Sequence, residues 1–289
     1  MFLLPTTLLD RYRRRHWQPD AQTQSYSRMR AATVITGASE GIGRALAAEF
    51  ARAGHELLLV ARSAEPLAAA AAELATSGVA VATLSADLAT AEGCAAVEAA
   101  LAAAGAYCDV LVNNAAIGFG GDFAAQPLDG LDRLVDLNIR AVTNLSRRFL
   151  PGMISRGRGG ILNVASLGAL MPGPQQAAYY ASKAYVLSLT EAIAQEVAGQ
   201  GLRISALVPG PVATKFHARM AAEHAYYLSL VGVMTAGEVA RAGYRGFQRG
   251  RTLVYPGVIH HLNAVALRLL PHWVIIPVVS WMLRPRQAG

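Results

Sequence analysis

The sequence predicts an α/β fold in which a doubly wound parallel sheet of about seven strands has helices on both faces. Short apolar runs alternate with longer alanine-rich stretches from residue 31 onward. The apolar runs are continuous, as is typical of parallel strands buried on both faces. The chain has 289 residues, and no stretch rich in proline, glycine or serine divides its body. A single domain is therefore expected.

Six apolar runs are expected to form strands: residues 32–36, 56–61, 79–86, 109–114, 160–166 and 202–209. A seventh short strand is expected at 252–256. The stretches 66–76 and 91–104 lie between strands and are expected to be helices. We interpret their alanine blocks as ordinary helical sequence, because alanine is the best helix former.

The ends of the chain differ from the body, so we divide it into residues 1–30, 31–257 and 258–289. The first 30 residues contain six arginines and two acids, and they predict a loosely ordered basic extension. Their apolar run is broken by Pro5 and precedes the basic residues, unlike a signal peptide. Met29 is an alternative start. An amphipathic membrane anchor stays open as the other interpretation, formed by Phe2, Leu3, Leu4, Leu8 and Leu9 with the basic residues 11–15.

Composition excludes several classes of function. The formal net charge is +7, but residues 31–289 carry only +3, with no basic stripe of the kind that binds nucleic acid. Cys94 and Cys108 lack the spacing of a metal site, and no disulfide framework is expected. We therefore expect no metal and no nucleic acid partner, and we expect a reducing cytoplasm.

A glycine-rich turn, TGASEGIG at 36–43, follows the first predicted strand. Glycines let a strand turn tightly into a helix and let the backbone approach a ligand. The helix expected to begin near Ile42 would direct its free N–H groups at a pyrophosphate. This turn predicts a dinucleotide site with these members: Thr36, Gly37, Ser39, Gly41, Ile42 and Gly43.

The end of the second strand indicates which dinucleotide is bound. An NAD-binding protein places an acid there for the ribose hydroxyl, whereas this chain has Ala61, Arg62 and Ser63. A guanidinium suits a 2′-phosphate, so NADP(H) is expected and NAD(H) is less favoured. Ser39 could add a hydroxyl to the same phosphate. The alternative is a solvated arginine at a strand end.

The stretch AYYASKAYV at 178–186 offers two tyrosines near one lysine. Helical spacing lets Lys183 reach Tyr179 or Tyr180 and does not choose between them. A free phenol has a pKa of about 10. An ammonium nearby is expected to lower that pKa and to make the phenol a useful proton donor or base.

These motifs resemble the short-chain dehydrogenase/reductase family over residues 31–255. The glycine turn has its TGxxxGxG spacing, Tyr179 and Lys183 fit its YxxxK pair, and Ser166 lies thirteen residues before Tyr179. The resemblance implies an oxidoreductase that interconverts a ketone or aldehyde and an alcohol on a Rossmann-type fold. It makes Tyr179 the acid/base, while Ser166 holds the substrate oxygen. It also implies that Lys183 binds the nicotinamide ribose and that Asn138, rather than Asn144, binds a proton-relaying water.

The resemblance also implies further cofactor contacts. Asp87 and Leu88 would lie by the adenine, although Asp87 could instead cap the next helix. The turn NNAA contributes Asn114 and Ala115, and its Ala116 departs from the family glycine, which would be strained if the position needed positive φ. VPGPVAT at 208–214 implies nicotinamide contacts from these residues: Pro209, Gly210, Val212 and Thr214.

Residues 211–235 coincide with the family's variable substrate loop. An apolar lid is expected there, formed by Phe216, Met220, Tyr226, Tyr227 and Leu228, and it predicts a lipophilic or bulky carbonyl substrate such as a 3-oxoacyl, steroid-like or xenobiotic ketone. His217 and His224 lack ligand spacing, so polar surface or pocket roles are favoured over metal. A non-catalytic dinucleotide sensor or scaffold is the rival function.

The tail, residues 258–289, is unusually apolar. Its densest run, 273–283, has eleven residues and contains Pro277, so it is too short to cross a bilayer. Three roles stay open. The tail could lie in a membrane interface through Trp273, Trp281, Arg284 and Arg286, fold over the pocket, or meet another subunit of a homo-dimer or homo-tetramer. A peripheral membrane protein dominated by this tail is a second rival.

Overall fold

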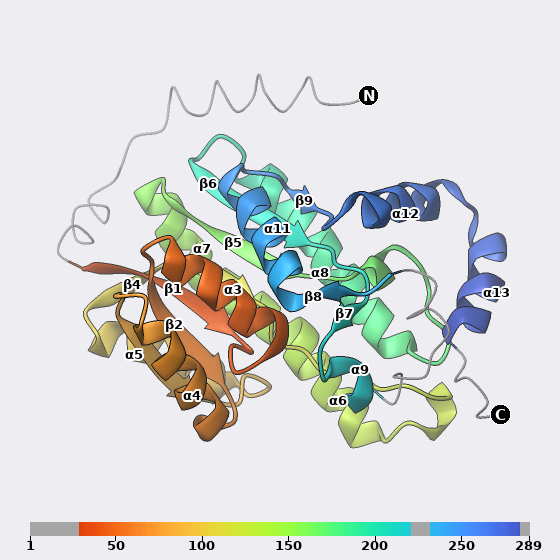
Figure 1. The fold of residues 1–289 in the computed structure, drawn as a ribbon, viewed down its shortest axis with the longest axis horizontal. Helices are drawn as coiled ribbons and strands as arrows, with labels where there is room; N and C mark the ends of the chain where they lie inside the picture. The colour runs from red at the N-terminus through yellow and green to blue at the C-terminus, as the bar shows by residue number, and fades with distance from the viewer. Residues whose placement is uncertain (1–28, 221–231, 284–289) are drawn as a thin grey trace.

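The computed structural model describes residues 29–220 and 232–283 (Figure 1). Its centre is a seven-stranded parallel sheet in the order β3-β2-β1-β4-β5-β6-β9, which confirms the predicted fold class. The strands are β1 Arg30–Thr36, β2 Glu56–Ala61, β3 Val81–Ser85, β4 Ala106–Asn113, β5 Gly159–Val164, β6 Leu202–Leu207 and β9 Leu253–Val254. The strands β1 and β4 each begin before their apolar runs, because Arg30 at the start of β1 pairs with Ala106 at the start of β4.

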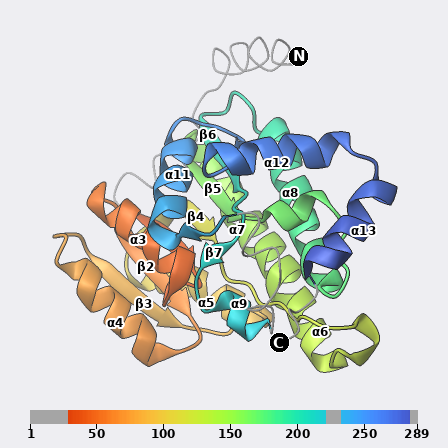
Figure 2. The same ribbon diagram turned by 45° about the vertical axis from the view of Figure 1, so that its right-hand side comes forward.

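Helices cover both faces of the sheet (Figures 1 and 2). One face is covered by α3 Gly41–Arg52, α4 Ala64–Ala75 and α11 Ala236–Gln248. The other is covered by α5 Ala91–Ala103, α7 Val142–Arg156 and α8 Ala177–Glu196. Both alanine-rich segments are therefore ordinary helices, as predicted.

The sheet divides the core into two apolar layers. Ile35 packs in the layer beneath α3 and α11, while its neighbour Val34 packs in the layer beneath α5 and α7. Successive side chains of a strand point to opposite faces, so a strand buried on both sides needs an unbroken apolar run. This requirement explains why the strands do not alternate with polar residues.

Shorter elements gather at the carboxyl ends of the strands. They are α6 Leu128–Val135, a π-helical segment Asp136–Ala141, the 3₁₀ turns Phe123–Ala125 and Leu167–Leu170, a small pair of strands β7 Val212–Ala213 and β8 Met234–Thr235, and α9 Phe216–Arg219. The segment 136–141 continues α6 into α7 with one wider turn, a feature common at functional sites.

The tail forms two helices, α12 Val258–Leu269 and α13 His272–Leu283. Figure 2 shows α12 running beside α8 and α13 turning back toward it. Ile275, Val279 and Leu283 of α13 pack on Tyr180 of α8. Among the described residues, no helix has both the length and the apolar character needed to cross a membrane.

Candidate active site

The site begins where the strand order reverses, between β1 and β4. Helical connections leave these neighbouring strands in opposite directions, which opens a crevice at their carboxyl ends. The Thr36 hydroxyl donates to Val112 O at 3.2 Å and accepts from the N–H groups of Asn114 and Ala115 at 2.9 and 3.1 Å. The Asn114 amide donates to Gly37 O at 3.1 Å. The glycine turn and the NNAA turn therefore form one hydrogen-bonded unit.

Each glycine of the turn has its own physical reason. Gly37 and Gly41 adopt φ of 64° and 57°, a region that favours glycine. A Cβ on Gly43 would lie 2.2 Å from Gly37 O and 2.4 Å from the Asn114 amide nitrogen. Backbone conformation thus favours glycine at 37 and 41, and packing requires glycine at 43. Ala116 has no positive φ, so its departure from the family glycine causes no strain of that kind.

The start of α3, next to the glycine turn, offers free backbone N–H groups that could bind an anion. Glu40, the N-cap residue, makes no side-chain capping bond, and the first turn of α3 holds no acid. The Glu40 carboxylate pairs instead with Arg219 of α9. Free N–H groups at a helix start suit phosphate oxygens.

A second polar group lies at the end of β2. Arg62 and Ser63 are exposed and line the same cavity as Ser39 and Gly41. Ser63 is the N-cap residue of α4, and its hydroxyl makes no capping bond. A guanidinium, two hydroxyls and a helix N-terminus are the donors that an NADP(H) 2′-phosphate needs, so the residues present fit that cofactor.

The structure corrects one interpretation of Asp87, its capping of the next helix, while its place by the adenine stays a prediction. Its carboxylate accepts from Ala89 N at 3.1 Å and from Arg133 at 2.7 Å, and the Asp87 side chain does not line the cavity. Burial alone would raise its pKa, but these two bonds outweigh it and hold the pKa below its usual range. Thr90, not Asp87, caps α5. Leu88 does line the cavity, as expected of a residue near the adenine.

Ser166 is held at the end of β5. The neighbouring N–H groups of Ala165 and Leu167 donate to Leu207 O and Pro209 O, both at 2.8 Å, which ties the segment to the end of β6. The Ser166 hydroxyl accepts from Gly168 N at 3.1 Å and hydrogen-bonds the Tyr179 hydroxyl. A serine and a tyrosine hydroxyl therefore meet at one point of the cavity.

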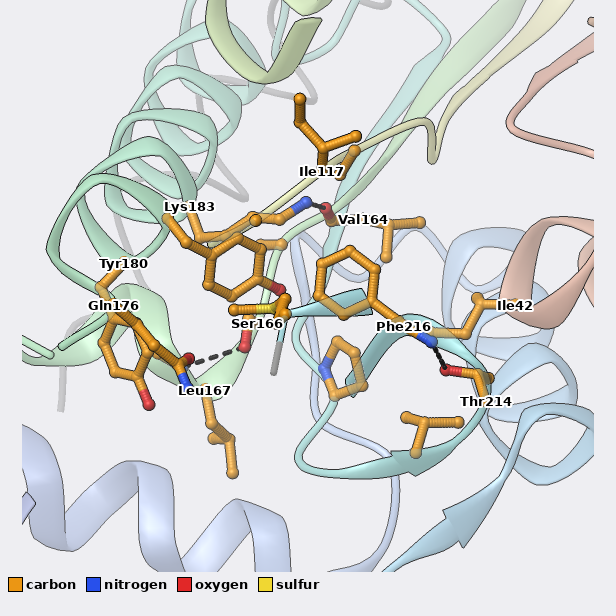
Figure 3. A pocket seen from close by; sticks show the side chains of 18 of the residues that line it. Ile42, Ile117, Val164, Ser166, Leu167, Gln176, Tyr180, Lys183, Thr214 and Phe216 are labelled. Atoms are coloured by element: carbon orange, nitrogen blue, oxygen red, sulfur yellow. Dashed lines mark hydrogen bonds between the residues drawn. The ribbon is translucent and has the colours of Figure 1, made fainter. Parts of the chain in front are cut away.

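Lys183 follows Tyr179 by one helical turn and extends toward β5. Its Nζ donates to Val164 O at 2.8 Å (Figure 3). The same nitrogen lies 5.8 Å from the centre of the Tyr179 ring. Lys183 is only 5% exposed, and burial lowers its pKa to about 8.

The prediction that Lys183 lowers the pKa of the Tyr179 phenol is wrong for the protein without cofactor. Burial raises the pKa of Tyr179 to about 12, and the hydrogen bond with Ser166 opposes this rise without cancelling it. The ammonium is directed at a carbonyl oxygen rather than at the phenol, so desolvation dominates. Tyr179 is consequently protonated at neutral pH.

Asn138 lies in the π-helical segment and is 1% exposed. Its amide oxygen accepts from Ile117 N at 3.0 Å. Its amide nitrogen donates to Ile117 O at 2.8 Å and to Ser182 Oγ at 3.0 Å. The side chain therefore fastens the chain after β4 to α8, and its role in a proton relay stays a prediction. Asn144 accepts from Arg148 on the outside of α7.

A cavity of about 940 Å³ connects these groups. Its lining contains every predicted nicotinamide contact at 209–214, together with Ser166, Tyr179 and Lys183. Phe216 and Met220 of the expected lid also line it, and Phe216 N donates to Thr214 Oγ1 (Figure 3). The other residues expected in this loop lie outside the described part of the chain: the His217 side chain, His224, Tyr226, Tyr227 and Leu228. No cluster of three or more potential metal ligands occurs in the two described ranges.

The tail supplies the remaining wall of the cavity, which bears out one of its three expected roles. Val274, Val278 and Met282 of α13 line it, with Ala266 and Leu267 of α12. Tyr180 of α8 is buried against α13, while the Tyr179 hydroxyl hydrogen-bonds Ser166. The structure thus separates the two tyrosines that helical spacing left equivalent.

A row of buried, hydrogen-bonded polar residues lies behind the site and was not predicted from the sequence. The Asn113 amide donates to Asn163 Oδ1 at 2.9 Å, and the Asn163 amide donates to Thr190 Oγ1 at 2.9 Å. All three are less than 5% exposed and link β4, β5 and α8. Polar residues at matching depth in two neighbouring strands, with Asn113 and Asn163 in register, were the available signal.

Comparisons with known proteins agree with this geometry. The short chain dehydrogenase model matches residues 31–225. The oxidoreductase UcpA of Salmonella typhimurium is 38% identical over 185 residues, covering 63% of this chain and 69% of that protein.

Two solved structures share the fold over most of the chain. A short-chain dehydrogenase from Sphingobium yanoikuyae in complex with NADPH has a TM-score of 0.73 at 33% identity, covering 90% of this chain and 98% of that one. A bulky-bulky ketone specific alcohol dehydrogenase from Comamonas testosteroni has a TM-score of 0.69 at 29% identity, covering 91% and 97%. Since the family model spans more than half of its length, the chain belongs to the short-chain dehydrogenase family of oxidoreductases.

Proposed function

We propose that the chain is an NADP(H)-dependent reductase that converts a bulky, lipophilic ketone into a secondary alcohol. The observation that carries this proposal is a single cavity lined by the glycine turn, Arg62, the Ser166–Tyr179–Lys183 group and the apolar tail. A cofactor seat, a proton donor and an apolar chamber therefore open into one space.

The cofactor would be held by the turn at 36–43, by Asn114 and Ala115, and by residues 209–214. Arg62, Ser63 and Ser39 would bind the 2′-phosphate. When bound, NADPH supplies the hydride. The Sphingobium yanoikuyae relative was solved in complex with NADPH, which supports this choice.

The remaining chemistry is a proton transfer. Ser166 donates a hydrogen bond to the substrate oxygen, and Tyr179 gives its phenolic proton to that oxygen as negative charge develops there. The Lys183 ammonium stabilises the phenolate that remains. Burial raises the pKa of Tyr179 to about 12, so at neutral pH the phenol carries the proton that ketone reduction requires.

The wall of the cavity indicates the substrate class. Phe216, Met220, Val278 and Met282 present apolar surface on the tail and lid sides. The Comamonas testosteroni relative is specific for bulky-bulky ketones, which supports the same class here. A lipophilic ketone would lose water-exposed surface against these side chains.

Tyr179→Phe tests the proposal by NADPH absorbance with a diaryl ketone. Loss of a general acid predicts a fall in kcat/KM of about 10²- to 10⁴-fold. NADPH binding, measured by cofactor fluorescence, is expected to persist. Turnover by the variant at the wild-type rate would refute the role of Tyr179. Equal turnover of small charged sugars and lipophilic ketones by the wild type would refute the substrate class.

A further inference from the structure

The helix α12 carries apolar residues on two opposite faces. His260 and Ala264 are buried against the body, and Leu267 lines the cavity. A second row at helical spacing points outward: Val258, Leu262, Val265 and Leu269. A surface helix normally has one apolar stripe and a polar opposite face, so the outward row is unexpected for a helix facing water.

The helix α13 repeats this arrangement. Its inward residues Ile275, Val279 and Leu283 recur every four positions and pack on Tyr180. Trp273, Pro277 and Trp281 recur at the same interval and are exposed. Trp273 is 78% exposed. A tryptophan has an apolar body and a polar N–H, a combination enriched where apolar and aqueous phases meet.

Nine exposed large apolar residues lie on the two tail helices and their connection: Val258, Ile259, Leu262, Val265, Leu269, Leu270, Trp273, Val278 and Trp281. Leu270 and Val278 also line the cavity, so we define the docking surface as the other seven. The described residues contain fourteen exposed large hydrophobic side chains in all. The two tail helices and their connection therefore hold most of them. This concentration distinguishes the docking surface from scattered exposed leucines, which need no explanation.

Charge indicates what covers this surface. The tail, residues 258–289, contains three arginines and no aspartate or glutamate, whereas residues 31–257 contain 17 basic and 17 acidic residues. A second copy of the chain would meet this surface with the same surface, because a two-fold contact is self-complementary. Two segments without acids would then face each other, so charge opposes that contact and favours an anionic partner.

We propose that the docking surface lies on an anionic lipid membrane, with α12 and α13 parallel to the bilayer in its interface. Helices of twelve residues are too short to span the hydrocarbon core, but they can lie in the interface with apolar side chains buried and polar groups near lipid headgroups. Since the opposite faces of the same helices line the cavity, the cavity wall would then lie next to the lipid phase.

Flotation of the full chain with lipid vesicles tests this proposal. The wild type is expected to float with phosphatidylcholine vesicles that contain phosphatidylserine, and to float less with phosphatidylcholine alone or in high salt. Replacing three outward residues, Leu262→Gln, Leu269→Gln and Trp273→Gln, is expected to weaken partitioning at least about tenfold. Glutamine keeps helix propensity, and none of the three lines the cavity.

Leu128→Gln is the matched control, because Leu128 is 73% exposed but belongs to α6. It should float like the wild type. NADPH binding and thermal unfolding of each variant report whether the fold persists. Flotation requires no turnover, so this proposal and the proposed function can fail separately.

Three outcomes would overturn the proposal. The wild type could remain in the dense fraction with anionic vesicles, or the triple variant could float as well as the wild type. A fall in molar mass of the triple variant by light scattering, with no flotation of the wild type, would instead assign the docking surface to a second copy.

Discussion

The ammonium of Lys183 donates to the carbonyl oxygen of Val164 at 2.8 Å, which ties the middle of α8 to the end of β5. This contact encloses the charge: Lys183 is 5% exposed, and burial lowers its pKa from 10.5 to about 8. The same residue that is proposed to stabilise the phenolate of Tyr179 therefore opposes folding at neutral pH. Activity and stability should respond in opposite directions when it is replaced.

Lys183→Met is expected to abolish ketone reduction and to raise the free energy of unfolding at pH 7. The pKa shift corresponds to roughly 3 kcal/mol of destabilisation, and loss of the bond to Val164 O returns about 1 kcal/mol. The net gain is roughly 2 kcal/mol. Urea unfolding at pH 7 provides the measurement, and a variant less stable than the wild type would contradict it.

The sign of the pH dependence follows from the lowered pKa. Between pH 8 and 10.5 the unfolded chain keeps the lysine proton and the folded chain loses it. The free energy of unfolding gained from this group therefore rises with pH across that window. The difference in stability between Lys183→Met and wild type should shrink as pH increases through it. A constant difference from pH 7 to 10.5 would show that the charge of Lys183 costs nothing.

Local sequence was sufficient for the sheet, the glycine turn and the Tyr179–Lys183 pair, because each depends on neighbours along one strand or helix. It could not distinguish Tyr179 from Tyr180 by geometry, since the distinction depends on Ser166 and on α13, which lies about a hundred residues away. The bond between Asp87 and Arg133 could not be predicted for the same reason, because it joins residues that are distant in the sequence. The fold brings together residues that no local pattern connects.

If Arg62 binds the 2′-phosphate, Arg62→Ser should weaken the binding of NADPH but not that of NADH. Removing one charge-assisted contact from an exposed site should raise the KM for NADPH about tenfold and leave the KM for NADH nearly unchanged. Arg52→Ser is the control, since Arg52 is also exposed but pairs with Glu49 on α3 and does not line the cavity. Steady-state kinetics with both cofactors provide the readout. An equal loss for NADPH and NADH would place Arg62 elsewhere than at the 2′-phosphate.

Gly43→Ala should be costly because its Cβ would lie 2.2 Å from a backbone oxygen of Gly37. Separating the glycine turn from α3 is expected to lower the free energy of unfolding by roughly 1–3 kcal/mol and to weaken NADPH binding. Gly237→Ala is the matched control in the first turn of α11, where the nearest atom is the Arg241 guanidinium at 3.7 Å. That change should be neutral or stabilise by up to about 1 kcal/mol. Equal stability of the two variants would mean that the turn relaxes without cost.

The buried hydrogen-bonded residues Asn113, Asn163 and Thr190 lie behind the cavity, and replacing one of them tests their contribution to stability. Thr190→Val preserves shape but removes the acceptor of the Asn163 amide, which is fully buried and has Thr190 as its partner at 2.9 Å. An unsatisfied buried donor costs about 1–3 kcal/mol. Thermal unfolding should show this loss. Thr143→Val removes a hydroxyl that bonds Tyr185 at the surface of α7 and should cost much less.

The same variant separates positioning from stability. Asn163 precedes Val164, whose carbonyl oxygen holds Lys183, and lies three residues before Ser166. If this row of buried polar residues fixes the end of β5, Thr190→Val should lower kcat for ketone reduction severalfold at temperatures where the variant is fully folded, with little change in the KM for NADPH. Unchanged kcat together with a lowered Tm would show that Asn113, Asn163 and Thr190 contribute to stability alone, because the end of β5 would then keep its position without their hydrogen bonds.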